Sequence, residues 1–330
     1  MLSRIRNFHL TPSQYLVIAS VALASLVLIV MTGSAVRLTG SGLGCPDWPK
    51  CYGGTVPPAD VNAIIEYGNR LLTGFVGLAV IAASVLAWRR RPFRWHLAAL
   101  GALLPLGVVG QAALGAAVVA SHLAPELVML HFILSMLLLD AAFALVWLSR
   151  YETNARRRST DRLGVWAARC LIPLGQLTIL LGTMSTAAGP HAGEHEGNIV
   201  RRFDFKGGET LQWLVERHSA LAVVFGLAAV GVLLILRRGG GDRRATRPLL
   251  ALIGLLALQG AVGAIQWSLE LPAAIVWVHV ALATFTWLAV LWTVATAGLL
   301  EPRRRRAAER TAASGSPPAA AREPEAAGVG

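Results

Sequence analysis

The sequence predicts an all-α polytopic membrane protein of eight transmembrane helices, built as two tandem four-helix bundles in parallel repeat. Two observations lead to this prediction: a strongly apolar composition, and polar residues that recur at a spacing close to half the chain. Hydrophobic residues make up 55% of the 330 residues and charged residues only 15%, against about 25% in soluble domains. The mean hydropathy is +0.57. Such a chain is expected to lie in a lipid bilayer.

Eight apolar stretches are long enough to cross a hydrocarbon core of about 30 Å, which takes about 20 helical residues. Polar or Gly- and Pro-rich connections separate them along the chain. The expected spans are 15–37, 70–88, 95–120, 126–148, 165–187, 218–236, 248–268 and 275–299.

The net charge of +12 could indicate a nucleic-acid-binding surface, but the positions of the basic residues are typical of a membrane protein. Arginine clusters at residues 4–6, 89–94, 156–162, 237–247 and 303–306 all fall on one side of an eight-helix topology. Cytoplasmic loops are enriched in Lys and Arg. We therefore expect a multi-pass protein of the cell (plasma) membrane with both termini cytoplasmic, anchored to membrane lipid and binding no nucleic acid. No cleavable signal peptide is expected, because the first apolar stretch is too long.

The polar connection at residues 150–162 divides the chain into two halves of four spans each. An even number of spans gives both halves the same orientation in the membrane. The expected organisation is an N-terminal bundle at 1–149, a cytoplasmic linker at 150–162 and a C-terminal bundle at 163–300. Residues 301–330 contain almost no large apolar side chain and are expected to form a disordered cytoplasmic tail.

Four polar residues lie at matched positions in the two halves. His218 follows Asn69 by 149 positions, and His279 follows His131 by 148, which indicates a duplicated unit. Histidine at membrane depth is costly unless it has a function, and facing helices that each offer an imidazole can hold a haem. Any one of these histidines could instead bond to a neighbouring helix. The matched set predicts a haem-binding protein, with all four residues within about 10 Å of the outer surface.

Small and amide residues follow the same spacing, and close helix packing explains them most simply. They are Gly33 with Gly182, Gln111 with Gln259 and Gly115 with Gly263.

Cys45 and Cys51 share the first outer loop, where Gly and Pro favour a tight bend. The external compartment permits a disulfide, which we expect between them. A structural role and a redox role are equally open for this bridge.

The segment from Arg37 to Cys51, read as RLTGSGLGCPDWPKC, and the element EYGNR at residues 66–70 resemble the haem A synthase family. The similarity extends over residues 14–300, and the contexts of His131 and His279 fit it. The resemblance implies an oxidoreductase that converts the C8 methyl of haem O to a formyl group through hydroxylated intermediates. It also implies a haem b cofactor between His218 and His279, and a substrate haem in the N-terminal half with His131 as its axial ligand.

The sequence departs from the family pattern at Asn69, where a histidine is common. An amide is a poor iron ligand, so the substrate haem would have His131 alone or another sixth ligand. The resemblance places Glu66 at the catalytic site together with Asn69 and Arg70.

The residues alone leave the role of Glu66 open, because Glu66 and Arg70 lie one turn apart and could form an interfacial ion pair. Arg37 and Arg70 could instead bind haem propionates through the guanidinium fork.

Two other functions fit parts of the pattern. A b-type membrane cytochrome that passes electrons between quinone and an external partner would also explain His218 and His279. A transporter would need polar residues near the middle of the membrane, and the histidines lie too close to one face for that. Expected partners of a haem A synthase are its substrate haem O, the haem O synthase that supplies it and oxidase assembly factors.

Overall fold

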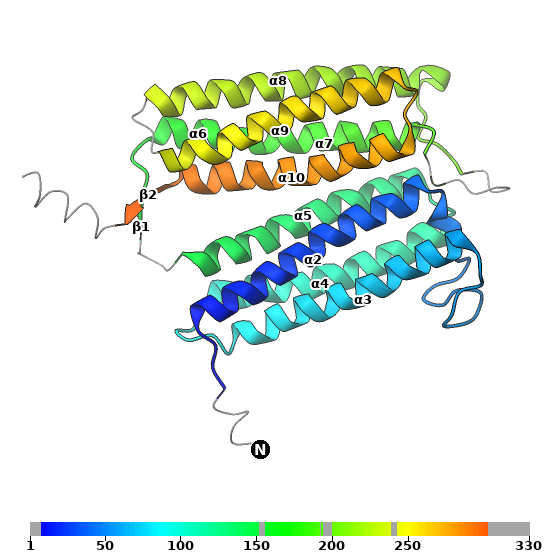
Figure 1. Cartoon of the computed structure of the whole chain (residues 1–330), viewed down its shortest axis with the longest axis horizontal. Coiled ribbons are helices and arrows are strands. Elements are labelled where there is room, and N and C mark those ends of the chain that lie inside the picture. Colours follow the sequence, from blue (N-terminus) through cyan, green and yellow to red (C-terminus); the bar gives the residue numbers. More distant parts are fainter. Residues whose placement is uncertain (1–7, 152–155, 192, 194–199, 239–242, 303–330) are drawn as a thin grey trace, which may run out of the picture.

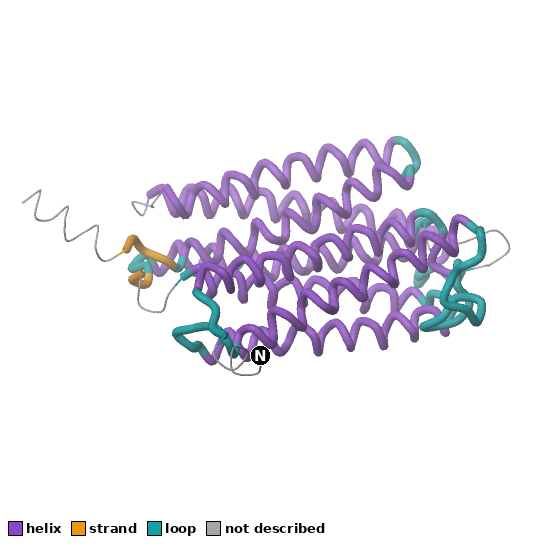
Figure 2. Tube along the Cα trace, turned by 60° about the horizontal axis from the view of Figure 1, so that its bottom comes forward, coloured by secondary structure: helices purple, strands orange, loops and turns teal. Residues whose placement is uncertain are grey.

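The computed structural model describes residues 8–151, 156–191, 193, 200–238 and 243–302. The expected tail at 301–330 therefore lies almost wholly outside the described residues, as does the middle of the expected linker. Long helices form most of the described chain, and the loops gather at two ends, as Figure 2 shows. The helices are α2 (Pro12–Leu38), α3 (Val61–Ala87), α4 (Trp95–Ala120), α5 (Pro125–Arg150), α6 (Arg162–Arg169), α7 (Leu171–Ala188), α8 (Thr210–Arg238), α9 (Arg243–Ser268) and α10 (Ala273–Ala297).

Eight helical segments within the described chain are long and apolar enough to cross a membrane, which confirms the predicted number. Helices α6 and α7 together form one of them, Arg162–Ala188. The break between them at Cys170 has a local cause, because Pro173 has no N–H to donate to the carbonyl of Arg169.

The eight spans form two groups of four (Figure 1). Helices α2 to α5 make one group, and α6 to α10 make the other. The loop at residues 39–60 lies at one end of the molecule, which we call the disulfide end.

Helices α3 and α8 begin earlier than the hydropathy predicts. Asn69 and His218 were expected to open their spans, but each lies eight residues inside its helix, which begins at Val61 or Thr210. The additional turns mix apolar residues with charged and amide ones, such as Glu66 in α3 and Glu216 in α8, and these lower the hydropathy at the start of each helix. At the start of α3, the side chain of Asp60 caps the helix by accepting a hydrogen bond from the N–H of Ala63.

A short two-stranded antiparallel sheet was not predicted. Strand β1 (Arg156–Arg158) pairs with β2 (Leu299–Pro302), and Arg156 lies opposite Pro302. The sheet joins the connection between the two halves to the chain that follows α10.

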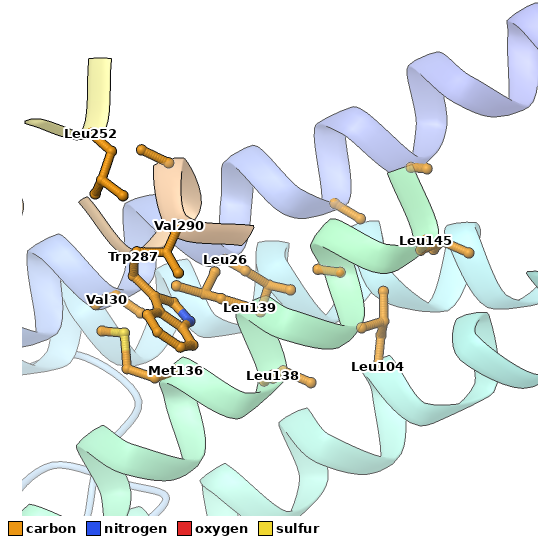
Figure 3. Close-up of a cluster of buried hydrophobic side chains, with 14 of the residues drawn as sticks. Leu26, Val30, Leu104, Met136, Leu138, Leu139, Leu145, Leu252, Trp287 and Val290 are labelled. Carbon is orange, nitrogen blue, oxygen red and sulfur yellow. The ribbon is translucent and has the colours of Figure 1, made fainter. Parts of the chain in front are cut away.

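The two halves pack against each other through α2, α5, α7 and α10. In the close-up of Figure 3, Trp287 of α10 lies among Val30 of α2 and Met136 and Leu139 of α5. Trp287 is almost completely buried, with 2% of its surface exposed. The core is therefore continuous between the halves.

Side-chain hydrogen bonds also connect the halves, among them a bond from Arg201, which precedes α8, to Glu126 of α5. The indole N–H of Trp277 donates to the carbonyl of Met31 at 2.9 Å, and that of Trp287 donates to Asp140 at 2.6 Å. The guanidinium of Arg37 donates to the carbonyl of Thr186 at 3.2 Å.

Candidate functional site

His218 and His279 face each other inside the second half. Their helices, α8 and α10, occupy opposite corners, and α7 and α9 lie between them on either side. The two ring centroids are 6.3 Å apart. Two metal–nitrogen bonds of about 2 Å, with about 1.1 Å from each nitrogen to its ring centre, add up to about 6 Å. The separation therefore fits one metal ion held between the two rings.

The ring of His218 is oriented by a backbone carbonyl. Its Nδ1 lies 3.0 Å from the oxygen of Thr178, a residue of α7. An Nδ1–H that donates to this carbonyl leaves the lone pair on Nε2 for a metal, which is the usual arrangement of a ligating histidine. Nδ1 of His279 is buried and has no hydrogen-bond partner among the described residues. Both rings therefore have a nitrogen that is not used by the protein.

Glycines make room for these rings. A Cβ atom placed on Gly182 would lie 2.9 Å from Cε1 of His218, and one on Gly263 would lie 3.3 Å from Cε1 of His279. The first distance is too short for any side chain, so glycine is required at position 182 unless the ring moves. The sequence suggested simple helix packing for these glycines, and the structure shows that they pack specifically against the histidine rings.

The corresponding contacts recur in the first half. Gly115 lies beside His131, with 3.6 Å between an added Cβ and Cε1 of the ring, and Gly33 lies beside Asn69, with 3.9 Å to Nδ2. Helices α3 and α5, which carry Asn69 and His131, again occupy opposite corners of their bundle. These recurring contacts support the predicted duplication.

Two buried atoms at these positions lack partners. They are Oδ1 of Asn69 and Nδ1 of His131, and neither forms a hydrogen bond within the described chain. The amide of Gln111 is directed at the backbone of α5 instead, where it donates to the carbonyl of His131 at 3.1 Å and to the hydroxyl of Ser135 at 2.9 Å. The unpaired atoms are those expected where a polar ligand completes the site.

Glu66 lies in a closed environment beside the disulfide loop, with 5% of its surface exposed. Its Oε2 accepts a hydrogen bond of 2.7 Å from the N–H of Cys45, and its Oε1 accepts one of 2.5 Å from Arg70. Both carboxylate oxygens are thus held by donors. This geometry includes the ion pair that the sequence left open, and it fixes the carboxyl group one turn from Asn69.

The guanidinium of Arg70 is bound to the disulfide loop. It donates to the carbonyls of Asp47 and Lys50, each at 2.7 Å, and to that of Cys45 at 3.4 Å. These bonds occupy its terminal nitrogens. Of the two arginines considered for propionates, Arg37 is therefore the better candidate, since its buried Nε has no partner among the described residues.

Cys45 and Cys51 form the expected disulfide, with 4.8 Å between their Cα atoms. The carboxylate of Asp47 closes the same loop by accepting hydrogen bonds from the N–H groups of Tyr52 and Gly53 at 2.6 and 2.8 Å. The bond from Gly53, with that from Tyr52, lowers the pKa of Asp47 below its ordinary value. Loop and carboxylate thus form one hydrogen-bonded unit at the disulfide end.

The two halves differ around their matched residues. At the spacing of 149 that relates Asn69 to His218, Glu66 corresponds to Val215 and Arg70 to Ser219. At these matched positions, the carboxylate and the guanidinium occur in the first half alone. The second half has the complete histidine pair and no acid at the matched position.

The sequence reasoning did not identify Asp140 and Trp287, which form a hydrogen bond between α5 and α10. A signal was present, because Asp140 is an acidic residue inside a predicted span, and such residues are rare in membranes.

The chain is similar to several known proteins. A family model described as cytochrome oxidase assembly protein (COX15-CtaA) matches residues 15–194. The heme A synthase of Alkalihalophilus pseudofirmus is 33% identical over 138 residues, which are 41% of this chain and 45% of that protein. The heme A synthase of Lysinibacillus sphaericus is 33% identical over 129 residues, 38% of this chain and 42% of that protein.

A third relative matches over a longer part of the chain. The protoheme IX farnesyltransferase of Thermus thermophilus is 31% identical over 300 residues, 84% of this chain and 47% of that protein. In all three relatives, the chain covers less than half of the relative's own length.

Proposed function

Because the chain belongs to the cytochrome oxidase assembly protein family, we propose that it is a haem A synthase, a membrane oxidoreductase acting on haem O. The reaction would oxidise the C8 methyl of haem O to a formyl group through hydroxylated intermediates. The observation that carries the proposal is the asymmetry of the halves: a complete histidine pair lies in one, and a histidine with a fixed carboxylate in the other.

In the second half, His218 and His279 would hold a haem b cofactor. Their 6.3 Å ring separation and the Thr178 carbonyl that orients His218 support this assignment. Held by two imidazoles, this haem would supply electron transfer rather than bind a reacting group. The second half would therefore hold an electron carrier next to the half in which the reaction takes place.

In the first half, His131 would bind the iron of the substrate haem. Asn69 belongs to the helix at the opposite corner of the bundle, and its amide would bind the iron weakly or not at all. Arg37, whose Nε is buried and unpaired, would donate to a haem propionate.

Glu66 would accept one of the protons that each oxidation releases. The N–H of Cys45 and the guanidinium of Arg70 hold the carboxyl group in place, so it needs no reorganisation when a substrate arrives. Exclusion of water around this group, with 5% of Glu66 exposed, would protect the partly oxidised intermediates.

The proposed location is the cell membrane, with both termini cytoplasmic and the disulfide end outside. The basic clusters at the opposite end support this orientation. The similarity to part of a protoheme IX farnesyltransferase supports a functional partnership with the haem O synthase that supplies the substrate. Oxidase assembly factors are further proposed partners.

The proposal can be tested in a host that makes haem O but no haem A. Pigments extracted from membranes with and without the protein are separated by chromatography. Haem A, or its alcohol precursor, should appear only with the protein. Unchanged haem O, in membranes that contain the protein with a low-spin haem, would instead support a b-type cytochrome that transfers electrons between quinone and an external partner.

The cofactor assignment has its own test. Replacing either His218 or His279 with Ala should abolish the low-spin haem spectrum of the purified protein. An unchanged spectrum in both variants would exclude this pair as the ligands.

A further inference from the structure

A cavity of about 440 Å³ lies where the two halves meet, between α5, α7 and α10. Leu, Ile and Met side chains make up most of its wall. Three other side chains in the wall have hydrogen-bonding groups: Asp140 of α5, Gln176 of α7 and Trp287 of α10. Small-molecule sites commonly have volumes of about 300–1,000 Å³ and a few polar groups in an apolar lining. The cavity has the size and the composition of such a site.

The cavity opens towards the side of the bundle. Two residues of its wall, Leu137 and Leu177, are 46% and 51% exposed, although they belong to membrane-spanning helices. Surface of this kind on a spanning helix is covered by lipid. A ligand would therefore enter from the bilayer rather than from water.

The polar groups lie deep along the helices. Asp140 is 15 residues from Pro125, where α5 begins, and this distance is about 22 Å along the helix. Gln176 is 12 residues from Ala188 at the end of α7, or about 18 Å. Both side chains thus lie near the middle of their spans, where an unused acid or amide is costly.

Packing between the halves explains only part of this cluster. The indole N–H of Trp287 donates to Oδ1 of Asp140, so Asp140 satisfies one buried donor. Gln176, however, forms no hydrogen bond with any described residue, although its amide has two donors and an acceptor. A polar partner from outside the described chain would satisfy it.

The duplication does not account for these residues either. At the spacing of the repeat, Asp140 corresponds to Leu288 and Gln176 to Val27. The acid and the amide are specific to this one interface.

We propose that the cavity binds an isoprenoid quinone. The head group of a quinone is uncharged, so it can enter the middle of a bilayer, and its carbonyl oxygens accept hydrogen bonds from groups such as the Gln176 amide. The apolar tail would extend past Leu137 and Leu177 into lipid. A phospholipid does not fit as well, because its charged head group stays at the surface, and an apolar tail alone needs none of the polar groups.

A quinone at this position would also accept the electrons and protons that the oxidation of haem O releases. This argument rests on the proposed function. Oxidation of a methyl to an alcohol with oxygen from water releases two electrons and two protons: R–CH3 + H2O + Q gives R–CH2OH + QH2, where Q is the quinone. The oxidised bond is the C–H bond of the methyl, and the quinone carbonyls take up the electrons and protons. Each following oxidation releases the same numbers and would reduce another quinone.

The cavity is close to both proposed haem positions. Asp140 follows His131 by nine residues on α5, and Trp287 follows His279 by eight on α10. Both separations correspond to about 12–14 Å along the helix. The hydrogen bond between Asp140 and Trp287 thus joins the helix of one candidate iron ligand to the helix of the other.

Photolabelling of the purified full chain, reconstituted in phospholipid nanodiscs with an azido-quinone that has a ten-carbon tail, tests the proposal. Labelling should be saturable and should map to α5 and α7. Leu177→Trp, which fills the mouth of the cavity, should weaken it about tenfold or more, and Gln176→Leu should weaken it about two- to tenfold through the lost hydrogen bond. The control is Leu227→Trp on α8, a position 68% exposed and outside the cavity, which should label like the parent.

Equal labelling in the parent and Leu177→Trp, or equal competition by dodecanol and by unlabelled quinone, would overturn the proposal. Because labelling needs no haem O, it is independent of the pigment experiment. Specific labelling without haem A formation would support the quinone site and contradict the proposed haem A synthase activity. Haem A formation without specific labelling would support the activity and contradict the quinone site.

Discussion

The backbone N–H of Cys45 donates a hydrogen bond of 2.7 Å to Oε2 of Glu66, so the disulfide loop and the candidate catalytic carboxylate form a single unit. Arg70 strengthens this connection, because it binds Glu66 and three carbonyls of the loop. The position of Glu66 therefore depends on the conformation of a loop that a disulfide closes.

The disulfide itself can be tested by thiol labelling of membranes that contain the Cys170→Ser variant. This substitution removes the one free cysteine and leaves only Cys45 and Cys51. We expect no label before reduction and two labels after it, measured by mass spectrometry of the intact chain. Full labelling without reductant would show that the bridge does not form.

If the loop positions Glu66, reduction should also lower the yield of haem A while the low-spin haem of the second half remains.

Gly182 and Gly33 allow a matched test of the histidine site. A Cβ at Gly182 would lie 2.9 Å from His218, whereas one at Gly33 would have 3.9 Å to Asn69. Overpacking of this kind costs about 1–3 kcal/mol. Gly182→Ala should therefore displace the His218 ring and weaken binding of the low-spin haem about tenfold or more, measured by haem titration of the purified protein. Gly33→Ala is the control and should bind this haem like the parent.

Equal haem binding by both glycine variants would indicate that the ring of His218 is not held against α7.

The ionisation of Asp47 should make the stability of the disulfide loop depend on pH. Its pKa is lowered in the folded protein by the N–H groups of Gly53 and Tyr52. A lowered pKa contributes stability above the unfolded value of about 3.9, and this contribution is lost as the pH falls through the folded value. Hydrogen-exchange protection of the Tyr52 and Gly53 amides should thus be full at neutral pH and decrease below about pH 4.

The Asp47→Asn variant is the control for this pH profile. It should show weaker protection at neutral pH and no further loss in acid, because its side chain does not titrate. The same pH profile in both proteins would assign the effect to another group.

The sequence predicted those features that depend on local composition. Long apolar runs revealed the eight spans, and two cysteines six positions apart in a loop revealed the disulfide. The starts of α3 and α8 were misplaced because charged and amide residues, such as Glu66 and Glu216, interrupt the apolar residues of their first two turns and lower the hydropathy there. Asn69 and His218 consequently lie within their helices rather than at the start.

Features that depend on the docking of the two halves were beyond sequence reasoning. Asp140 and Trp287 are 147 residues apart, and nothing in either local sequence specifies the other as a partner. The roles of the arginines also required the structure. In the sequence, Arg37 and Arg70 were equivalent candidates for binding haem propionates. In the structure, Arg70 is bound to the disulfide loop, whereas Arg37 lies against Thr186 at the boundary between the halves.

The central claim is that the first half oxidises the substrate haem and the second half holds haem b. Its most direct test compares the extracted pigments and the haem spectra of Glu66→Ala and His131→Ala. The control is Val215→Ala, at the position that matches Glu66. The first two variants should retain the low-spin haem b spectrum, lose haem A, and accumulate haem O or its alcohol intermediate. Val215→Ala should form haem A like the parent. Haem A at parental levels from both Glu66→Ala and His131→Ala would contradict the account and place the chemistry elsewhere in the protein.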